Sequence, residues 1–253
     1  MPNIAITYTS LQKRDEAEQL ALELNLPLIA LQPATNQYRY LLVLTPEYIG
    51  LQHTKDKKFA PYFVDFLSTR LQYRRKQANL RNELLAKAMG CKPKDKPYIV
   101  DATAGWGRDS YLLASLGYSV TLLEKSPILA VLIKDALSRL TLSNPVLAQQ
   151  MTFVQTDALD WLPHTKPDIV YLDPMFPQRK KSASVKKEMV ILQELLLNDG
   201  NLQDLLAVAL ACAKQRVVVK RPRLAQTIGG QRLPHFSLTG KSCRFDIYLT
   251  RAG

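Results

Sequence analysis

The sequence predicts an α/β protein, in which a mostly parallel sheet is covered by helices on both faces and is preceded by a small α/β unit. Of the 253 residues, 47% are hydrophobic, which is enough for one large domain and a smaller one. After Pro97, short apolar runs alternate with helix-length segments, whereas the first 65 or so residues contain short strand-like runs and a single helical pattern. We therefore expect a small N-terminal α/β subdomain at 1–67, a basic helix and linker at 68–96, and the main domain at 97–253.

The main domain carries the pattern of repeated strand-helix-strand units. Strands are expected at 98–103, 119–124, 151–157, 167–173, 216–222 and 243–250, and helices at 107–117, 126–140, 186–197 and 202–214. Helices of this length between strands imply right-handed crossovers and therefore parallel pairing. The last strand follows only a short loop region, so we expect it to pair antiparallel.

The N-terminal region predicts strands at 4–8, 40–45 and 58–66 around a helix at 14–24. Residues 68–89 predict one long basic helix, with Ser68 or Thr69 as its N-cap and Gly90 as its stop. The segment CKPKDKP that follows is expected to be a linker.

A glycine-rich corner follows the first strand of the main domain, in the stretch VDATAGWGRDS. The strand ends at Asp101, and Gly105 and Gly107 precede a helix expected to start near Arg108. Glycines at such a corner let the backbone approach a ligand, although the same pattern also serves as a purely structural turn. Ligands of parallel sheets bind at the carboxyl ends of the strands, which makes this corner a candidate binding site.

Polar residues also end the next two strands. Glu124 follows Asp101 by 23 residues, where an acid can accept both hydroxyls of a ribose, although it could instead be a charge near a helix start. Thr156 and Asp157 end the third strand and could contact an adenine, or Asp157 could cap the following segment. Together these strand ends describe a nucleoside site. The form DxTxGxG suits S-adenosylmethionine, which has no phosphate, better than NAD.

The fourth strand ends in Asp-Pro-Met-Phe, which resembles the [DNS]-P-P-[FYW] motif of enzymes that methylate amino groups on bases. Such an amine is a poor nucleophile because its lone pair is delocalised into the ring. The Asp173 carboxylate and the Pro174 carbonyl can each accept one N–H and hold the nitrogen in line with a methyl donor. Phe176 offers a face on which a flipped-out base can stack. We expect Asp173, Pro174 and Phe176 to be the catalytic group.

The charge pattern predicts a nucleic-acid partner. The net charge is +12, and the segment from Lys55 to Lys96 holds twelve Lys or Arg against four acids. The residues expected to contact RNA are Arg70, Arg74, Arg75, Arg179, Lys180, Lys181, Lys220 and Arg221.

The three cysteines and three histidines are scattered, so no metal is expected. No run of 18 apolar residues occurs, and we expect a cytoplasmic monomer with no membrane contact.

The stretches DATAGWGRD and DPMFPQRKKSA, together with VTLLEKSP, RVVVKRP and KSCRFDIY, resemble the ribosomal RNA small-subunit methyltransferase J family. The resemblance spans Tyr98 to Thr250. It implies a Rossmann-like class I S-adenosylmethionine-dependent methyltransferase fold, with a mostly parallel seven-stranded sheet and an antiparallel last strand. It also implies methylation of guanine N2 near the 3′ end of 16S rRNA, with free rRNA or the assembling 30S subunit as substrate.

The family's cofactor positions fall on Arg108, Asp109, Glu124, Lys125, Thr156, Asp157 and Asp173, which join Asp101, Gly105 and Gly107 as expected contacts of S-adenosylmethionine. Two other functions remain open from the residues alone. One is methylation of a different base amine, such as adenine N6 in DNA or RNA. The other is RNA binding by a protein whose cofactor pocket is vestigial.

Overall fold

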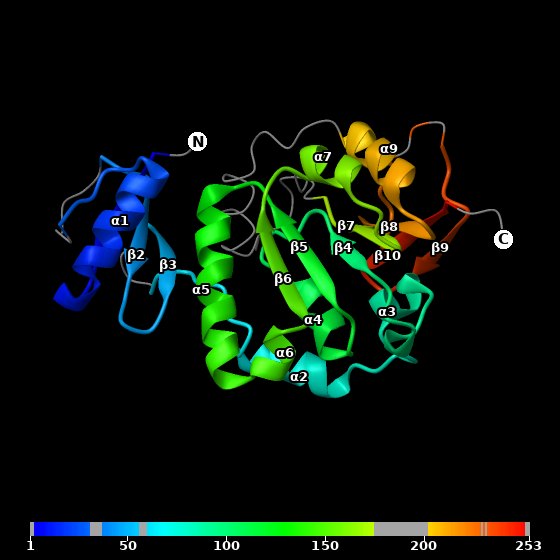
Figure 1. The fold of residues 1–253 in the computed structure, drawn as a ribbon, viewed down its shortest axis with the longest axis horizontal. Helices are drawn as coiled ribbons and strands as arrows, with labels where there is room; N and C mark the ends of the chain where they lie inside the picture. The colour runs from blue at the N-terminus through cyan, green and yellow to red at the C-terminus, as the bar shows by residue number, and fades with distance from the viewer. Residues whose placement is uncertain are drawn as a thin grey trace.

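The computed structural model describes residues 3–30, 37–55, 60–174, 202–228, 230 and 232–250. The described chain contains a three-stranded and a seven-stranded sheet. Figure 1 shows the small sheet and α1 at one end of the molecule, with α5 between them and the larger sheet. The predicted helix at 186–197 lies outside the described residues. The two sheets fall within the segments 1–67 and 97–253, and we retain those domain boundaries as a proposal.

The small sheet has the order β1-β2-β3, from Ile4–Tyr8, Tyr40–Leu44 and Ile49–His53. The helix α1 (Arg14–Leu24) follows the short 3-10 helix η1 (Leu11–Lys13) and connects the parallel strands β1 and β2. The prediction for the third strand was wrong. It placed this strand at 58–66, but β3 is Ile49–His53 and pairs antiparallel with β2. Of the described residues 60–66, Tyr62 alone forms a bridge, to Leu51, with which it exchanges both backbone hydrogen bonds.

The predicted long helix at 68–89 is two helices, α2 (Thr69–Gln77) and α3 (Leu84–Met89). The helix breaks at Ala78, whose backbone is extended. The side chain of Asn79 accepts hydrogen bonds from the backbone N–H groups of Arg81 and Asn82, and the Asn82 side chain accepts one from the Asn79 N–H in return. Asparagine side chains thus replace helical hydrogen bonds at this point, and the chain turns before α3 begins.

The large sheet has the strand order β6-β5-β4-β7-β8-β10-β9. Its strands are β4 (Ile99–Asp101), β5 (Val120–Glu124), β6 (Met151–Gln155), β7 (Ile169–Leu172), β8 (Arg216–Pro222), β9 (Phe236–Thr239) and β10 (Cys243–Leu249). The first five are parallel, and β10 pairs antiparallel with both β8 and β9. The antiparallel last strand is therefore confirmed. Strand β9 has mostly exposed residues and was not identified from the pattern.

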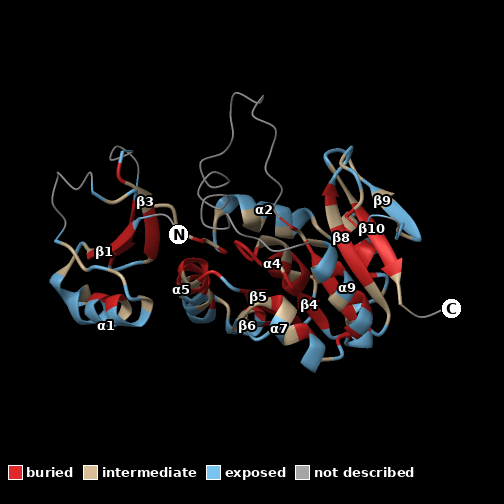
Figure 2. Cartoon of the chain, turned by 90° about the horizontal axis from the view of Figure 1, so that it is seen from above, coloured by how far each residue is buried: buried red, intermediate tan, exposed pale blue. Residues whose placement is uncertain are grey.

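Helices cover both faces of this sheet. One face packs on α3, α4 (Arg108–Ser115), α5 (Pro127–Ser143) and α6 (Pro145–Ala148), and the other on α7 (Ala158–Trp161) and α9 (Leu202–Cys212). Along β4 and β7 alternate residues face alternate layers, as the pleat requires. Two short 3-10 helices complete the described elements, η2 (Pro93–Asp95) and η3 (Leu162–His164). Figure 2 shows the buried strands enclosed by helices with exposed outer faces.

The helix starts predicted near Arg108 and at Ser126 are confirmed. The Ser126 hydroxyl accepts the Leu129 N–H, and Pro127 occupies the first position of α5. The helix α4 begins at Arg108 after Gly107, as expected. Among the described residues, no helix combines the length and the apolar composition needed to cross a bilayer.

Candidate active site

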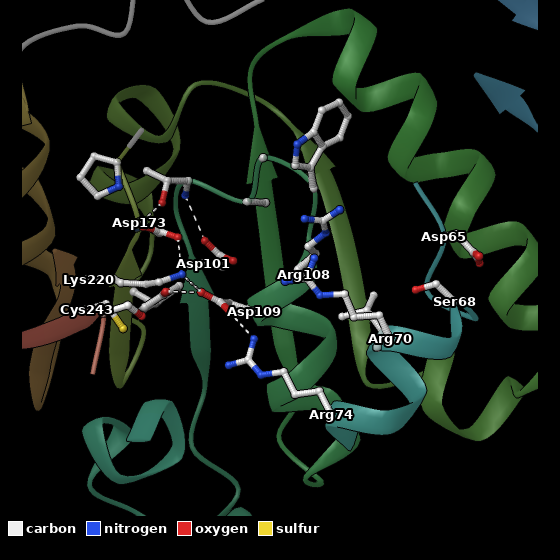
Figure 3. Close-up of a pocket in the computed structure, with 18 of the residues that line it drawn as sticks. Asp65, Ser68, Arg70, Arg74, Asp101, Arg108, Asp109, Asp173, Lys220 and Cys243 are labelled. Carbon is white, nitrogen blue, oxygen red and sulfur yellow. Dashed lines mark hydrogen bonds and ion pairs between the residues drawn. The ribbon is translucent and has the colours of Figure 1, made fainter. Parts of the chain in front are cut away.

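A pocket of about 690 Å³ lies at the carboxyl ends of β4, β7 and β8. Figure 3 shows Asp101, Asp109, Asp173 and Lys220 on one side, and Asp65, Ser68, Arg70 and Arg74 from α2 and the segment before it on the other. The aromatic residues of the lining are Tyr62, Phe63, Trp106 and Tyr171. Segments far apart in the sequence therefore build the walls of one cavity.

Asp101, at the end of β4, is the most buried acid of the pocket, with 2% of its surface exposed. Its carboxylate accepts hydrogen bonds from the Ser110 hydroxyl and from the Thr103 backbone N–H, at 2.5 and 3.2 Å. Burial raises the pKa of Asp101 to about 7, although these two hydrogen bonds favour its ionised form. The group can therefore gain or lose a proton near neutral pH.

The glycine corner adopts the backbone conformation that the sequence predicts. Gly105 and Gly107 have φ angles of 52° and 66°, which residues with a side chain rarely adopt. The Glu124 carboxylate accepts the backbone N–H of Gly105 at 3.1 Å and that of Ser126 at 2.8 Å. Glu124 thus ties the corner after β4 to the end of β5.

Four side chains meet at the end of β7. The Lys220 Nζ lies 2.7 Å from Asp173 Oδ2 and 2.6 Å from Asp109 Oδ2. The Tyr171 hydroxyl donates to Asp109 Oδ2 at 2.7 Å, and Arg74 Nη1 lies 3.5 Å from Asp109 Oδ1. The cluster of Asp109, Tyr171, Asp173 and Lys220, which we name the acid–lysine cluster, thus joins α4, β7 and β8 and is linked through Arg74 to α2.

The electrostatics of this cluster follow from burial and pairing. Burial raises the pKa of Asp173, an effect that the Lys220 ammonium opposes and the Asp109 carboxylate reinforces. Burial would also raise the pKa of Asp109, but Lys220, Tyr171 and Arg74 together hold it below its ordinary value. The two acids in turn raise the pKa of Lys220 well above its ordinary value against the effect of burial. The Lys220 side chain therefore carries a positive charge at neutral pH.

The opposite wall is aromatic and basic. The rings of Tyr62 and Trp106 lie 4.8 Å apart, and Arg108 Nη2 donates to the Tyr62 hydroxyl at 2.8 Å. Arg139 of α5 fixes this segment, since its guanidinium stands over the Phe63 ring at 5.1 Å and bonds to the Val64 carbonyl. The wall that residues 62–66 form is thus anchored to the large sheet's helical layer.

The pocket unites ten of the residues predicted to form the site. They are Arg70, Arg74, Asp101, Gly105, Arg108, Asp109, Asp173, Pro174, Lys220 and Arg221. Six others lie outside its lining, namely Arg75, Gly107, Glu124, Lys125, Thr156 and Asp157. The last four stand at or after the ends of β5 and β6, on the far side of β4 from β7. Phe176, Arg179, Lys180 and Lys181 lie outside the described residues.

The residues at the ends of β5 and β6 contact one another. Asp157 Oδ1 accepts the Leu159 N–H and caps α7, and its other oxygen lies 3.9 Å from Lys125 Nζ. The capping role considered for Asp157 is therefore real, and the carboxylate keeps a second oxygen that faces a lysine. Thr156 and Asp157 are both partly exposed.

Lys220 and Arg221, predicted to bind RNA, are largely enclosed. Arg221 is 6% exposed and donates to the Gln226 carbonyl, and the Lys220 side chain is 27% exposed between two acids.

The sequence did not identify Thr103, Tyr171 and Ser110 as hydrogen-bond partners of the acids. The strand pattern could have identified Tyr171, because it lies two residues before Asp173 and so faces the same side of the sheet. Among the described residues, no group of three or more metal-ligating side chains gathers anywhere.

Comparison with known proteins gives consistent matches. The model of the family described as "Putative SAM-dependent methyltransferase" matches residues 25–250. The chain is 45% identical to the ribosomal RNA small subunit methyltransferase J of Nitrosococcus oceani, covering 99% of this chain and 100% of that protein. It is 44% identical to the protein of the same name from Thioalkalivibrio sulfidiphilus, covering 98% of each.

A solved structure extends the likeness to three dimensions. A SAM-dependent methyltransferase from Neisseria gonorrhoeae is 32% identical, with a TM-score of 0.72, and the match covers 98% of this chain and 97% of that one. The fold described above is therefore the Rossmann-like fold of S-adenosylmethionine-dependent methyltransferases.

Proposed function

The chain belongs to the ribosomal RNA small subunit methyltransferase J family of S-adenosylmethionine-dependent methyltransferases, and from this premise we propose that it methylates N2 of a guanosine near the 3′ end of 16S rRNA. The observation that supports this proposal most is the placement of Asp173 and Pro174 at the end of β7, in the same pocket as the glycine corner. Methyl donor and target amine would then share one cavity.

The residues present fit S-adenosylmethionine. When bound, this molecule supplies a methyl group on a positively charged sulphur. Asp101 and Asp109 provide buried negative charge near the corner, and Gly105 allows close approach of the backbone. Glu124, Lys125, Thr156 and Asp157 continue the polar edge along β5 and β6, and we assign them, with Gly107 and Arg108, to the cofactor as well. A cation in this pocket favours the ionised form of Asp101, whose pKa stands near 7 without it.

The target amine is aligned by acceptors on the protein. Asp173 Oδ2 is held by Lys220, and the backbone N–H of Asp173 donates to Thr103 Oγ1 at 2.6 Å. The rigid carboxylate and the Pro174 carbonyl would each accept one N–H of the amine, which directs the nitrogen lone pair toward the methyl group. We propose that Phe176 stacks on the flipped base beside them.

The RNA would approach over the basic side of the pocket. Arg70 and Arg74 are exposed on α2 and reach the cavity, and Arg75 lies on the same helix. We include Arg179, Lys180 and Lys181, directly after the Asp-Pro-Met-Phe motif, in this phosphate-binding surface. The net charge of +12 strengthens attraction to a polyanion and makes binding depend on salt. We propose that the protein acts as a monomer in the cytoplasm, on rRNA or on the assembling 30S subunit.

A methyl-transfer assay tests this function directly. Tritiated S-adenosylmethionine is incubated with the protein and with either 16S rRNA or 30S subunits from cells that lack it, and the labelled nucleoside is identified. We expect N2-methylguanosine. Labelled N6-methyladenosine would replace the guanine assignment, and cofactor binding without transfer to any RNA would contradict the enzymatic function.

Asp173→Ala provides the matched variant. Transfer should fall by roughly 10²- to 10⁴-fold, the range typical for loss of a group that orients or accepts a proton in the transition state. The affinity for S-adenosylmethionine, measured by calorimetry, should change much less. Unchanged turnover in this variant would remove the role assigned to Asp173.

A further inference from the structure

Lys220 lies beside Asp173 and contacts two carboxylates, an arrangement that a simple RNA-phosphate contact does not require. Strands β7 and β8 are parallel, with Leu172 opposite Val219, so the next residues along them, Asp173 and Lys220, lie side by side. The Nζ atom contacts Oδ2 of Asp173 and Oδ2 of Asp109 at 2.7 and 2.6 Å. Both ion pairs are partly buried, since the three side chains are between 11% and 36% exposed.

The Lys220 ammonium offsets the repulsion between the Asp109 and Asp173 carboxylates. Two carboxylates that contact the same atom repel each other, and burial of either one is costly without a cation nearby. Lys220 removes that repulsion and also fixes which oxygen of Asp173 remains available. Among the described residues, Lys220 bonds to Oδ2 of Asp173 and Thr103 accepts its backbone N–H, while Oδ1 has no hydrogen-bond partner and keeps its full acceptor capacity.

We propose that Lys220 is a positioning residue for methyl transfer, which clamps Asp173 Oδ2 so that Oδ1 faces the target amine. This inference rests on the function proposed above. Lys220 acts through Asp173 and does not itself touch the reacting atoms. Asp109, held by Tyr171 and Arg74, serves as the second anchor of the clamp and keeps the lysine from swinging toward solvent.

The competing role for Lys220 is a phosphate contact, as its place in the basic run KRPR suggests. Two of the three ammonium N–H donors already point at the acids, whose charges offset that of the lysine, so at most one donor is left for a phosphate. The two roles predict different kinetics. A phosphate contact mainly affects RNA affinity and its salt dependence, while a positioning residue mainly affects turnover at saturating RNA.

Lys220→Met is the first test, with Lys214→Met as its matched control. Lys214 lies shortly before β8, pairs with Asp168 at 3.9 Å and is absent from the pocket lining. Lys220→Met should lower kcat by roughly 10²-fold, the scale of a misplaced reacting group, with KM for RNA changed by less than about threefold. Lys220→Arg should recover part of kcat, and Lys214→Met should match the wild type.

The pH profile of kcat separates positioning from a general loss of structure. The described groups that bear on Asp173 are Lys220 of β8, Asp109 of α4, Asp101 of β4 and Tyr171 of β7, and Arg74 of α2 acts on it through Asp109. Asp173 must be ionised to accept the amine, and loss of the Lys220 charge raises its pKa further. The acid limb of the profile should therefore move to higher pH in Lys220→Met and stay in place in Lys220→Arg.

A wild type that transfers no methyl group to small-subunit RNA would overturn the proposed function before Lys220 is tested. If the wild type is active and Lys220→Met raises KM for RNA with kcat and the acid limb unchanged, Lys220 is a phosphate contact and the positioning role is wrong. If Lys220→Met does not fold, Lys220→Gln, which keeps a hydrogen-bond donor without the charge, undergoes the same measurements.

Discussion

Replacement of Asp101 by asparagine should make the protein more stable relative to the wild type at high pH than at low pH. Asp101 is 2% exposed, and its pKa in the fold stands near 7 in place of 3.8. Each tenfold change in proton affinity is worth about 1.4 kcal/mol, so the ionised carboxylate costs the folded state about 4 kcal/mol. Asparagine has the same shape, can accept the Thr103 N–H and can bond to Ser110, but never ionises.

Proton binding by the two states sets the sign of the effect. Between about pH 4 and pH 7 the unfolded chain has released the Asp101 proton while the folded protein still holds it. The free energy of unfolding of the wild type therefore falls as pH rises through this window and levels off above it. In Asp101→Asn this contribution is absent, so the difference between variant and wild type should grow by about 2 to 4 kcal/mol from about pH 5 to about pH 8.

Urea denaturation of both proteins without S-adenosylmethionine measures this difference, because titrating groups that do not interact with Asp101 cancel between them. Ser138→Ala, on the exposed side of α5, serves as a control and should track the wild type at every pH. A difference between Asp101→Asn and the wild type that stays the same at both pH values would refute the reasoning. It would mean that the carboxylate is already ionised in the fold at about pH 5.

Two further predictions concern the glycine corner and the RNA surface. Gly107→Ala should lower the free energy of unfolding by more than the roughly 1 to 2 kcal/mol expected for a left-handed backbone, because a Cβ there would lie 3.1 Å from Phe66 and 3.3 Å from Leu122. Gly230→Ala, with a φ of 57° and, among the described residues, no atom closer than 3.6 Å to the new Cβ, should show the backbone cost alone in the same denaturation experiment. Arg70→Gln combined with Arg75→Gln should weaken rRNA binding and reduce the slope of log affinity against log salt by up to about 1 to 2 in filter binding. Arg14→Gln on α1 should leave that slope unchanged, and an unaltered slope in the double variant would remove α2 from the contact surface.

The strand ends of the large sheet were predictable because an apolar run that stops at an acid is typical of a parallel strand that leads into a site. Asp101 and Glu124 end buried strands and Asp173 directly follows one, and the parallel order places β4 between β5 and β7. The same logic could not reveal how the ends differ. Asp173 joins the pocket with Asp101, while Glu124 lies with β5 and bonds to the glycine corner.

Several features of the fold could not be predicted from the sequence, because they depend on tertiary contacts or on hydrogen bonds of side chains. Strand β9 exposes most of its residues and is defined by its pairing with β10, so its own pattern carries little signal. The break between α2 and α3 depends on hydrogen bonds between Asn79 and Asn82, each of which is tolerated on a helix surface. The position of Lys220 depends on the register of β7 against β8, two strands that are far apart in the sequence.

The insertion of β10 between β8 and β9 sets an order of events during synthesis. Until Cys243–Leu249 has emerged from the ribosome, β8 has no partner on the side away from β7, and β9 has no place in the sheet. Domains fold as units while the chain grows from its N-terminus. Lys220 on β8 therefore reaches its final surroundings only late in translation, so a nascent chain that stops before β10 would carry Asp101, Glu124 and Asp173 and still lack the completed sheet beside β8.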